Sequence, residues 1–373
     1  MSLAALKSAI DAVSAPTVSF TLLTVAFPFF FPPTDWFEKI HRKLGFWRLW
    51  TKQGGITGLF LITVFFVLGY FDKNFNVTLT KPDNFPIVLM VYSMFFYIWL
   101  GMYKAYQNDE RLDAGLRPNE YNDPDDKVLV WPDLVYIEFI ALILFQVFLI
   151  VWSILVAAPI EEPANPAATP NPSKAPWYFL GLQEMLVYFD PWLAGVVFPT
   201  MIILGLMAIP YMDINKKGDG YYTFKERRVG IFIFMYGWIV LWLFLILIGT
   251  FFRGPNWNFF GPFEYWDTHK VVALNNVNLS ELFWVKLLGK GLPSNILVRE
   301  SLGFMAVGIY LFILPLILAK TKLKETYETY GPIRFVSLMI FGLGMLALPI
   351  KMYLRWAINL KYIVAIPEWF FNI

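Results

Sequence analysis

A proline-rich run, residues 162–178, holds the residues with the clearest chemical meaning in this chain. Five of its seventeen residues are proline, and only Glu162 and Lys174 carry charge. Proline restricts the backbone, so the run should form a stiff connector between the two strongly apolar segments that flank it. The run ends in the aromatic pair Trp177 and Tyr178. A stiff connector at a membrane surface, closed by two aromatic rings, predicts one wall of a site for a flat hydrophobic ligand.

The two histidines limit the redox chemistry that the chain can support. His41 and His269 are its only histidines, and it has no cysteine. Without cysteine there is no disulfide, no thiolate metal site and no covalently attached c-type haem. Membrane haems are commonly held between two histidines, but His41 and His269 are expected on opposite sides of about 30 Å of hydrocarbon. We therefore predict that this chain holds no haem and no metal of its own.

The composition indicates a protein that crosses a membrane several times. Of the 373 residues, 58% are hydrophobic and 16% are charged, whereas soluble domains are about 25% charged. A spanning helix needs roughly 20 apolar residues. The predicted fold class is therefore all-α, a polytopic transmembrane helical protein with seven spans and a possible eighth at 17–31. The seven predicted spans are 54–71, 86–107, 133–158, 192–211, 229–252, 302–320 and 333–352.

The distribution of Lys and Arg predicts which loops face the cytoplasm. Alternating the seven spans places 34–53, 104–131, 212–228 and 320–334 on one side, with 18 Lys and Arg against 11 on the other. Cytoplasmic loops are enriched in these residues, so the loop 159–191 is predicted to face the periplasm of a bacterial cytoplasmic membrane. The net charge of +2 gives no indication of nucleic-acid binding.

A further segment and an ion pair are expected at the membrane surface. In 34–50 the apolar residues share one helical face, which predicts an amphipathic interfacial helix with Thr34 as its N-cap. On the opposite side, Arg253 is expected to form an exposed ion pair with Glu264 or Asp267, worth under about 1 kcal/mol.

The proline-rich run also carries a family resemblance. Residues 162–169, with Trp177, Tyr178 and Phe179, resemble the C-terminal half of cytochrome b, and most closely the haem-free subunit IV of cytochrome b6f-type complexes. That family has Glu-Pro-Ala-Asn-Pro after its first helix, as this chain has at 162–166, and Pro-Glu-Trp-Tyr where the next segment begins. The resemblance extends more loosely through the neighbouring helices, over about a third of the chain.

The resemblance implies three regions and a quinol site. Residues 1–131 would be an N-terminal membrane extension, 132–252 the subunit IV-like module, and 253–373 a periplasmic loop with two further spans. The family implies that the proline-rich loop and the Trp-Tyr segment enclose a quinol head group near the periplasmic face. The quinol-binding residues expected from it are Pro163, Asn165, Pro166, Pro176, Trp177, Tyr178, Phe179, Leu180 and Met185.

Two positions depart from the family pattern. Ala175 and Pro176 stand where the family has Pro-Glu, so the glutamate that accepts a quinol proton there is missing, and Val187 stands where the family has an arginine. A replacement acid is Glu184, which follows Trp177 by two helical turns on the same face.

The role of Glu184 has two interpretations. A carboxylate in the membrane costs on the order of 3 kcal/mol, so it should have either a function or a partner. Proton acceptance and a structural pairing with Gln183 or a neighbouring subunit explain Glu184 equally well. Glu138, early in the span 133–158, is a weaker candidate for proton uptake at a second quinone site, and a packing role is favoured there.

We therefore interpret the chain as a haem-free subunit of a quinol-oxidising, electron-transport complex that translocates protons, as in a respiratory chain. The expected cofactor is quinone or quinol, in contact with membrane lipids. The expected partners are a dihaem subunit like the N-terminal half of cytochrome b, which would hold the b haems, and an iron–sulfur or c-type cytochrome subunit. The alternative is a scaffold subunit of a respiratory or photosynthetic redox complex with a degenerate quinol site. The missing glutamate motivates that alternative.

Overall fold

The computed structural model describes residues 2–122, 129–156, 163–167, 169–214 and 220–373. Over these residues the regular structure is helical apart from two isolated bridges and a small antiparallel hairpin. In the hairpin, Ala365 of β1 (Ala365–Ile366) pairs with Asn372 of β2 (Phe371–Asn372), and Ile366 pairs with Phe371. The predicted all-α class is confirmed. Glu162, the first residue of the family-like run, lies outside the described residues.

In the described part of the chain, seven helical segments are long and apolar enough to cross a membrane, and each covers one predicted span. Several contain π-helical or proline-containing turns. The spans are α4 (Lys52–Tyr70); α6 (Phe85–Asp113) after the turn η2 (Pro82–Asn84); η4 (Val130–Leu134) with α7 (Val135–Leu155); η6 (Leu193–Val197) with α9 (Phe198–Met212); α10 (Arg228–Met235), η7 (Tyr236–Leu243), α11 (Phe244–Leu247) and η8 (Ile248–Phe252); α14 (Ser301–Gly308), η11 (Ile309–Ile313) and α15 (Leu314–Lys320); and α16 (Lys324–Ile358).

The possible eighth span is a bent pair. The helices α1 (Leu3–Ser14) and α2 (Pro16–Phe30) meet at an angle of 74° around Ala15, and together they are apolar enough to enter a membrane. Pro16 begins α2, a position that proline favours because it lacks the N–H that a helix start cannot satisfy. The predicted segment 17–31 is therefore the second half of a bent pair, a broken span or a re-entrant segment, and α2 covers nearly all of it.

The predicted interfacial helix is also divided. It consists of α3 (Asp35–Lys43) and the 3-10 helix η1 (Phe46–Trp50), with Gly45 between them at φ 76°. Residues with a side chain rarely adopt this left-handed conformation, so glycine ends α3 here. Thr34 occupies the N-cap position, but its side chain makes no capping hydrogen bond.

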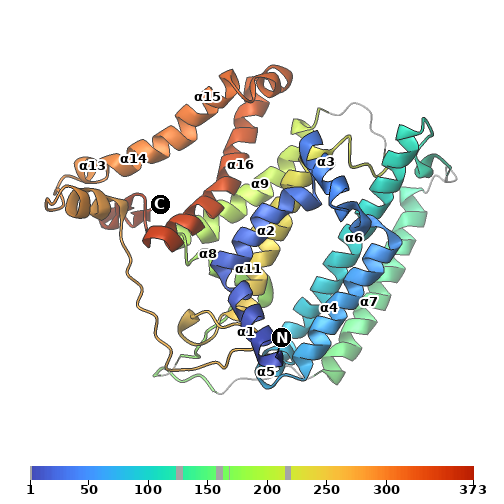
Figure 1. Ribbon diagram of the computed structural model, residues 1–373, viewed down its shortest axis with the longest axis horizontal. Helices are drawn as coiled ribbons and strands as arrows, with labels where there is room; N and C mark the ends of the chain where they lie inside the picture. The colour runs from blue at the N-terminus through green and yellow to red at the C-terminus, as the bar shows by residue number, and fades with distance from the viewer. Residues whose placement is uncertain (1, 123–128, 157–162, 168, 215–219) are drawn as a thin grey trace.

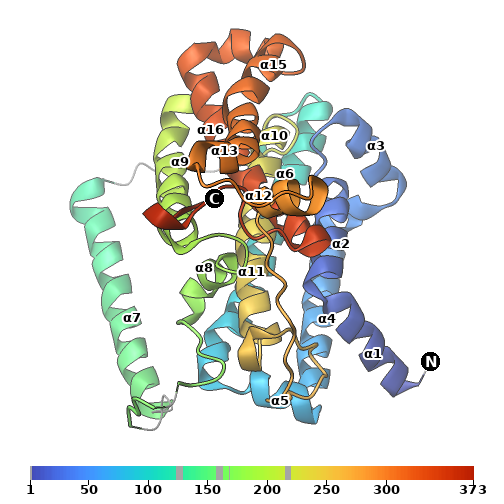
Figure 2. The same cartoon turned by 90° about the vertical axis from the view of Figure 1, so that its left-hand side faces the viewer.

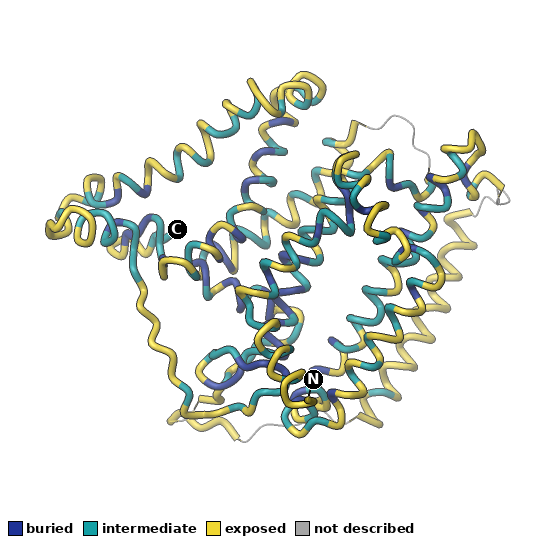
Figure 3. Tube along the Cα trace, in the orientation of Figure 1, coloured by how far each residue is buried: buried dark blue, intermediate teal, exposed yellow. Residues whose placement is uncertain are grey.

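The core forms around the span 228–252. Side chains from α2, α8 (Leu180–Met185) and α16 pack against it, including Phe20, Met185 and Met352. Figure 3 shows buried residues along these elements, whereas α7 is exposed along its length. In Figure 2, α7 stands apart from the other helices, and a contact between the rings of Phe85 and Trp152 joins it to α6.

Short elements close the two ends of the bundle (Figure 1). At one end Asn74 donates to the carbonyl of Phe263, and the loops before α8 and after η8 meet. At the other end Arg228 pairs with Asp35. This grouping agrees with the alternation of loops predicted above; the side that faces the periplasm stays a prediction. The remaining elements are α5 (Lys73–Leu79), η3 (Asn119–Asn122), η5 (Trp177–Phe179), η9 (Pro255–Trp257), α12 (Leu279–Glu281), η10 (Leu282–Leu287), α13 (Ile296–Arg299) and η12 (Pro367–Trp369).

Candidate functional site

The proline strap, defined here as residues 169–176, is fixed to α8 by one glutamine. Gln183 accepts a hydrogen bond from the backbone N–H of Ala175 at 2.9 Å and donates one to the carbonyl of Ser173, also at 2.9 Å. A strap rich in proline offers few backbone N–H groups of its own, so a side chain from the neighbouring helix supplies the contacts. The strap therefore lies along α8 rather than extending into solvent.

A tight turn after the span 228–252 approaches the strap from the other side. Asn258 donates its backbone N–H to the carbonyl of Pro255 at 3.1 Å, and the two residues between them, Asn256 and Trp257, both have φ 57°. Positive φ at both central positions is the type I′ pattern of hairpin turns. Asparagine adopts this conformation readily and tryptophan rarely, so the turn holds Trp257 at a local cost of about 1 kcal/mol.

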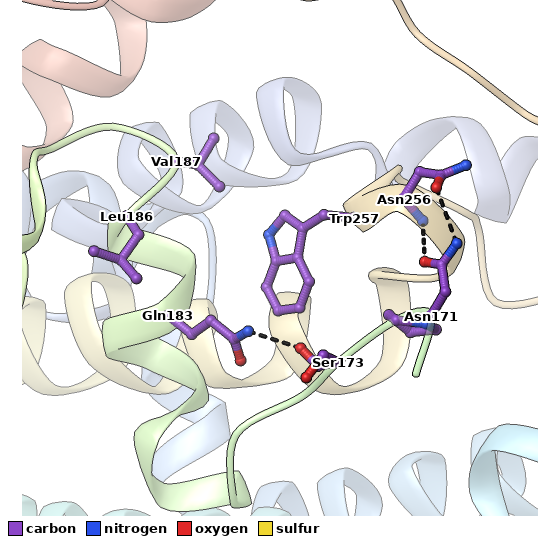
Figure 4. A pocket seen from close by; sticks show the side chains of 8 residues that line it. Asn171, Ser173, Gln183, Leu186, Val187, Asn256 and Trp257 are labelled. Atoms are coloured by element: carbon purple, nitrogen blue, oxygen red, sulfur yellow. Dashed lines mark hydrogen bonds between the residues drawn. The ribbon is translucent and has the colours of Figure 1, made fainter. Parts of the chain in front are cut away.

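Paired amides join the turn to the strap. Asn171 donates from Nδ2 to Oδ1 of Asn256 at 2.9 Å, and its own Oδ1 accepts the backbone N–H of Asn256 at 2.6 Å. Figure 4 shows these bonds beside the ring of Trp257. The two loops, 85 residues apart in sequence, thus form one continuous wall.

The strap, α8 and the turn enclose an open cavity of about 420 Å³. Its walls combine amide and hydroxyl groups with an indole ring and two aliphatic side chains, and none of the described lining side chains titrates near neutral pH. Such a lining can orient a flat ligand that has polar edges, but it cannot itself accept a proton. The lining residues are Asn171, Pro172, Ser173, Gln183, Leu186, Val187, Asn256 and Trp257.

A buried ion pair lies next to this cavity. Glu184 is fully buried, and Arg253 binds it with two hydrogen bonds, Nε to Oε2 at 2.9 Å and Nη2 to Oε1 at 2.6 Å. The indole of Trp257 donates to Oε2 of Glu184 at 3.2 Å, and Arg253 Nη1 donates to the carbonyl of Trp257. The ion pair therefore fixes the same tryptophan that lines the cavity.

The prediction that Arg253 forms an exposed ion pair with Glu264 or Asp267 was wrong. Its side chain is 12% exposed and binds Glu184, whereas Glu264 binds Lys270 at 2.8 Å. Gln183, the partner expected for Glu184 within this chain, uses its side chain to bond the strap instead. One signal in the sequence pointed to an ion pair without identifying the partner: a buried carboxylate needs a cation, and Arg253 is one of the cations that follow a span ending on the side of α8.

Lys174 fixes the strap at a third point. Its ammonium group donates to the carbonyl of Thr250 at 2.7 Å and lies 5.1 Å from the centre of the Trp266 ring. Burial, assisted by the positive charges of Lys81 and Arg253, lowers the pKa of Lys174 to about 7. This amine can therefore change its protonation state near neutral pH, unlike an exposed lysine.

None of the predicted quinol-binding residues belongs to the described lining of the cavity. Pro163, Asn165 and Pro166 are exposed on the loop before the strap, and Leu180 and Met185 are buried. Trp177 packs against the cluster of Phe75, Ile87 and Phe251, while the remaining predicted residues, Pro176, Tyr178 and Phe179, are exposed. Their contact with quinol stays a prediction.

The histidines have structural partners. His41 is fully buried, with Nδ1 2.6 Å from the carbonyl oxygen of Phe29 and Nε2 2.8 Å from the hydroxyl of Tyr106. Burial lowers the pKa of His41, and this favours the neutral ring. His269 lies on the surface beside Asp267. Within the described ranges, no group of three or more His, Asp or Glu residues is arranged to hold a metal ion.

The fold and the site define a polytopic, all-helical membrane protein whose strap, α8 and turn share one cavity. Residues 163–261 match the family model described as Cytochrome b(C-terminal)/b6/petD, which confirms the predicted resemblance over about a quarter of the chain. The match supports a subunit of a cytochrome b-type quinol oxidoreductase complex. It extends beyond residue 252 and so includes the turn at Asn256. No solved structure matches the chain.

Proposed function

We propose that this chain is a haem-free membrane subunit of a quinol-oxidising complex and that the cavity beside the strap receives the quinol head group. One observation carries the proposal: every described residue that lines the cavity falls within the segment matching the cytochrome b family, although the turn at Asn256 is far in sequence from the strap and α8. The amides of Asn171 and Gln183 would orient the ring oxygens, and the indole of Trp257 would lie against the ring.

The ion pair divides the proposed role of Glu184 into two steps. An ionised carboxylate held by two guanidinium bonds is a poor proton acceptor until at least one bond opens. We propose that Glu184 first positions Trp257 through Arg253, and accepts a quinol proton only when Arg253 withdraws. The oxidised partner subunit takes the electrons, and this chain supplies binding, orientation and the proton acceptor.

The test uses the complete complex, purified in mild detergent through a tag on this chain, with quinol-dependent reduction of its acceptor as the readout. We expect haem absorbance in the partner chains and turnover that falls at least tenfold in Trp257→Ala. If the carboxylate takes the proton, Glu184→Gln should lower the maximal rate and change the Michaelis constant much less. Unchanged turnover in both variants would contradict the proposed function.

The second candidate function is a scaffold subunit with a degenerate quinol site, favoured by Ala175 and Pro176 where the family has Pro-Glu. A scaffold requires the complex to assemble but needs no ligand in the cavity. Quenching by quinone of the fluorescence that Trp257 contributes separates the two. This contribution is the difference between the complex and the same complex carrying Trp257→Phe. Quinone that leaves this signal unchanged while the complex still turns over supports the scaffold.

A further inference from the structure

A second open groove lies in the N-terminal region, outside the segment 163–261. It has a volume of about 700 Å³ and is formed by the end of α2, the short helix η1 and the first three turns of α4. Its walls include the aromatic rings of Phe30, Phe46 and Trp47. It belongs to the opposite end of the bundle from the strap, because it adjoins α3, which pairs with Arg228.

The groove has a charged end and an apolar end. Arg48 and Lys52 line it where α4 begins, and Leu61 lines it further along the same helix. At 1.5 Å per residue, the nine residues from Lys52 to Leu61 correspond to roughly 14 Å along α4. The groove thus runs from the level of the membrane surface into the hydrocarbon, with both cations at the surface end.

The two cations are available to a ligand. Among the residues that the structure describes, neither Arg48 nor Lys52 has a carboxylate within 4.0 Å, and both are exposed. On the adjacent helix, by contrast, Arg42 pairs with Glu38, and Arg228 reaches the same glutamate. An acidic side chain therefore pairs with Arg42 and Arg228, but none pairs with the two cations of the groove.

We propose that this groove binds an anionic glycerophospholipid, with its phosphate between Arg48 and Lys52 and an acyl chain lying toward Leu61. The shape matches a charged head on an apolar chain, and the unpaired cations supply the complementary charge. Trp47, which is exposed beside Arg48, has the amphipathic ring favoured at the head-group level. The inference concerns the N-terminal region alone and does not depend on the proposed quinol site.

The experiment measures lipid preference on the full purified chain in detergent. Thermal stability and native mass spectrometry are followed while phosphatidylglycerol or phosphatidylcholine with identical acyl chains is added. We expect at least tenfold tighter binding of phosphatidylglycerol, because each basic residue contributes about fivefold. Inorganic phosphate at the same concentration should give no stabilisation, since it lacks the chain that fills the groove.

The decisive variant is Arg48→Gln/Lys52→Gln, which should bring the preference for phosphatidylglycerol close to one while leaving the melting temperature in phosphatidylcholine unchanged. The matched control is Lys39→Gln/Lys322→Gln, which removes two exposed cations predicted on the same side but outside the groove. The control should keep the preference. Equal binding of the two lipids by the wild type, or an equal loss in both double variants, would overturn the proposal.

Discussion

Two spans with the same mean hydropathy have opposite surroundings. The segments Val130–Leu155 and Arg228–Phe252 both reach 2.7, yet none of the first is buried in the protein, compared with 33% of the second. Hydropathy therefore indicates that a segment enters lipid, but it does not indicate which neighbours surround it there. The buried span leads directly into Arg253 and the cavity, and α7 is left free to contact lipid or a partner subunit.

The clearest difference between the two spans should appear at the end of the buried one. Arg253→Met leaves the buried carboxylate of Glu184 without its cation, and we expect the free energy of unfolding to fall by about 3–5 kcal/mol. Denaturant unfolding in detergent measures this loss. The control Lys324→Met removes an exposed pair with Glu328 and should cost less than about 0.5 kcal/mol.

A double variant sharpens the same experiment. Glu184→Met/Arg253→Met replaces both charges with apolar side chains, so it should recover a large part of the stability that Arg253→Met loses. If the double variant were no more stable than the single one, the ion pair would not be the cause of the loss.

Matched leucine truncations compare the spans directly. Leu245→Ala removes a side chain that is 1% exposed in the buried span, whereas Leu144→Ala removes one that is 66% exposed in α7. We expect a loss of about 2 kcal/mol for the first, mainly from lost packing, and within about 0.5 kcal/mol for the second in the isolated chain. Equal losses would mean that α7 packs against the bundle more closely than the structure indicates.

The last comparison concerns a pH dependence at the lysine that joins the strap to the buried span. The pKa of Lys174 is about 7 in the folded chain against 10.5 for the ordinary side chain, so the unfolded chain binds more protons between these pH values. The free energy of unfolding should therefore rise as the pH increases above 7, by at most about 1.4 kcal/mol per pH unit.

The measurement is the melting temperature between pH 6.5 and 9. Lys174→Met should lose this part of the increase, because the titrating amine is gone. Lys290→Met, at an exposed position, should retain it. A wild-type profile that matches that of Lys174→Met would contradict the burial of the Lys174 amine.

The sequence predicted the spans well because each depends on a local property, the length of an apolar run. It also located the region of the site, because prolines and aromatic residues stand close together in 162–178. It did not identify the partner of Glu184, since Arg253 is 69 residues away and lies on another helix. The break at Gly45 and the lining by Asn256 and Trp257 were missed because both depend on backbone conformations that the residue pattern did not reveal.

Three attachments along the strap restrict how a molecule can reach the cavity. Asn171, Ser173 with Ala175, and Lys174 are each held by a different element, so the strap has no free stretch on which it could swing aside. Exchange of a bound molecule must then proceed through the open face of the cavity while the loop stays in place. The rate of exchange would depend on lateral arrival from the surrounding membrane rather than on a gating motion of the loop.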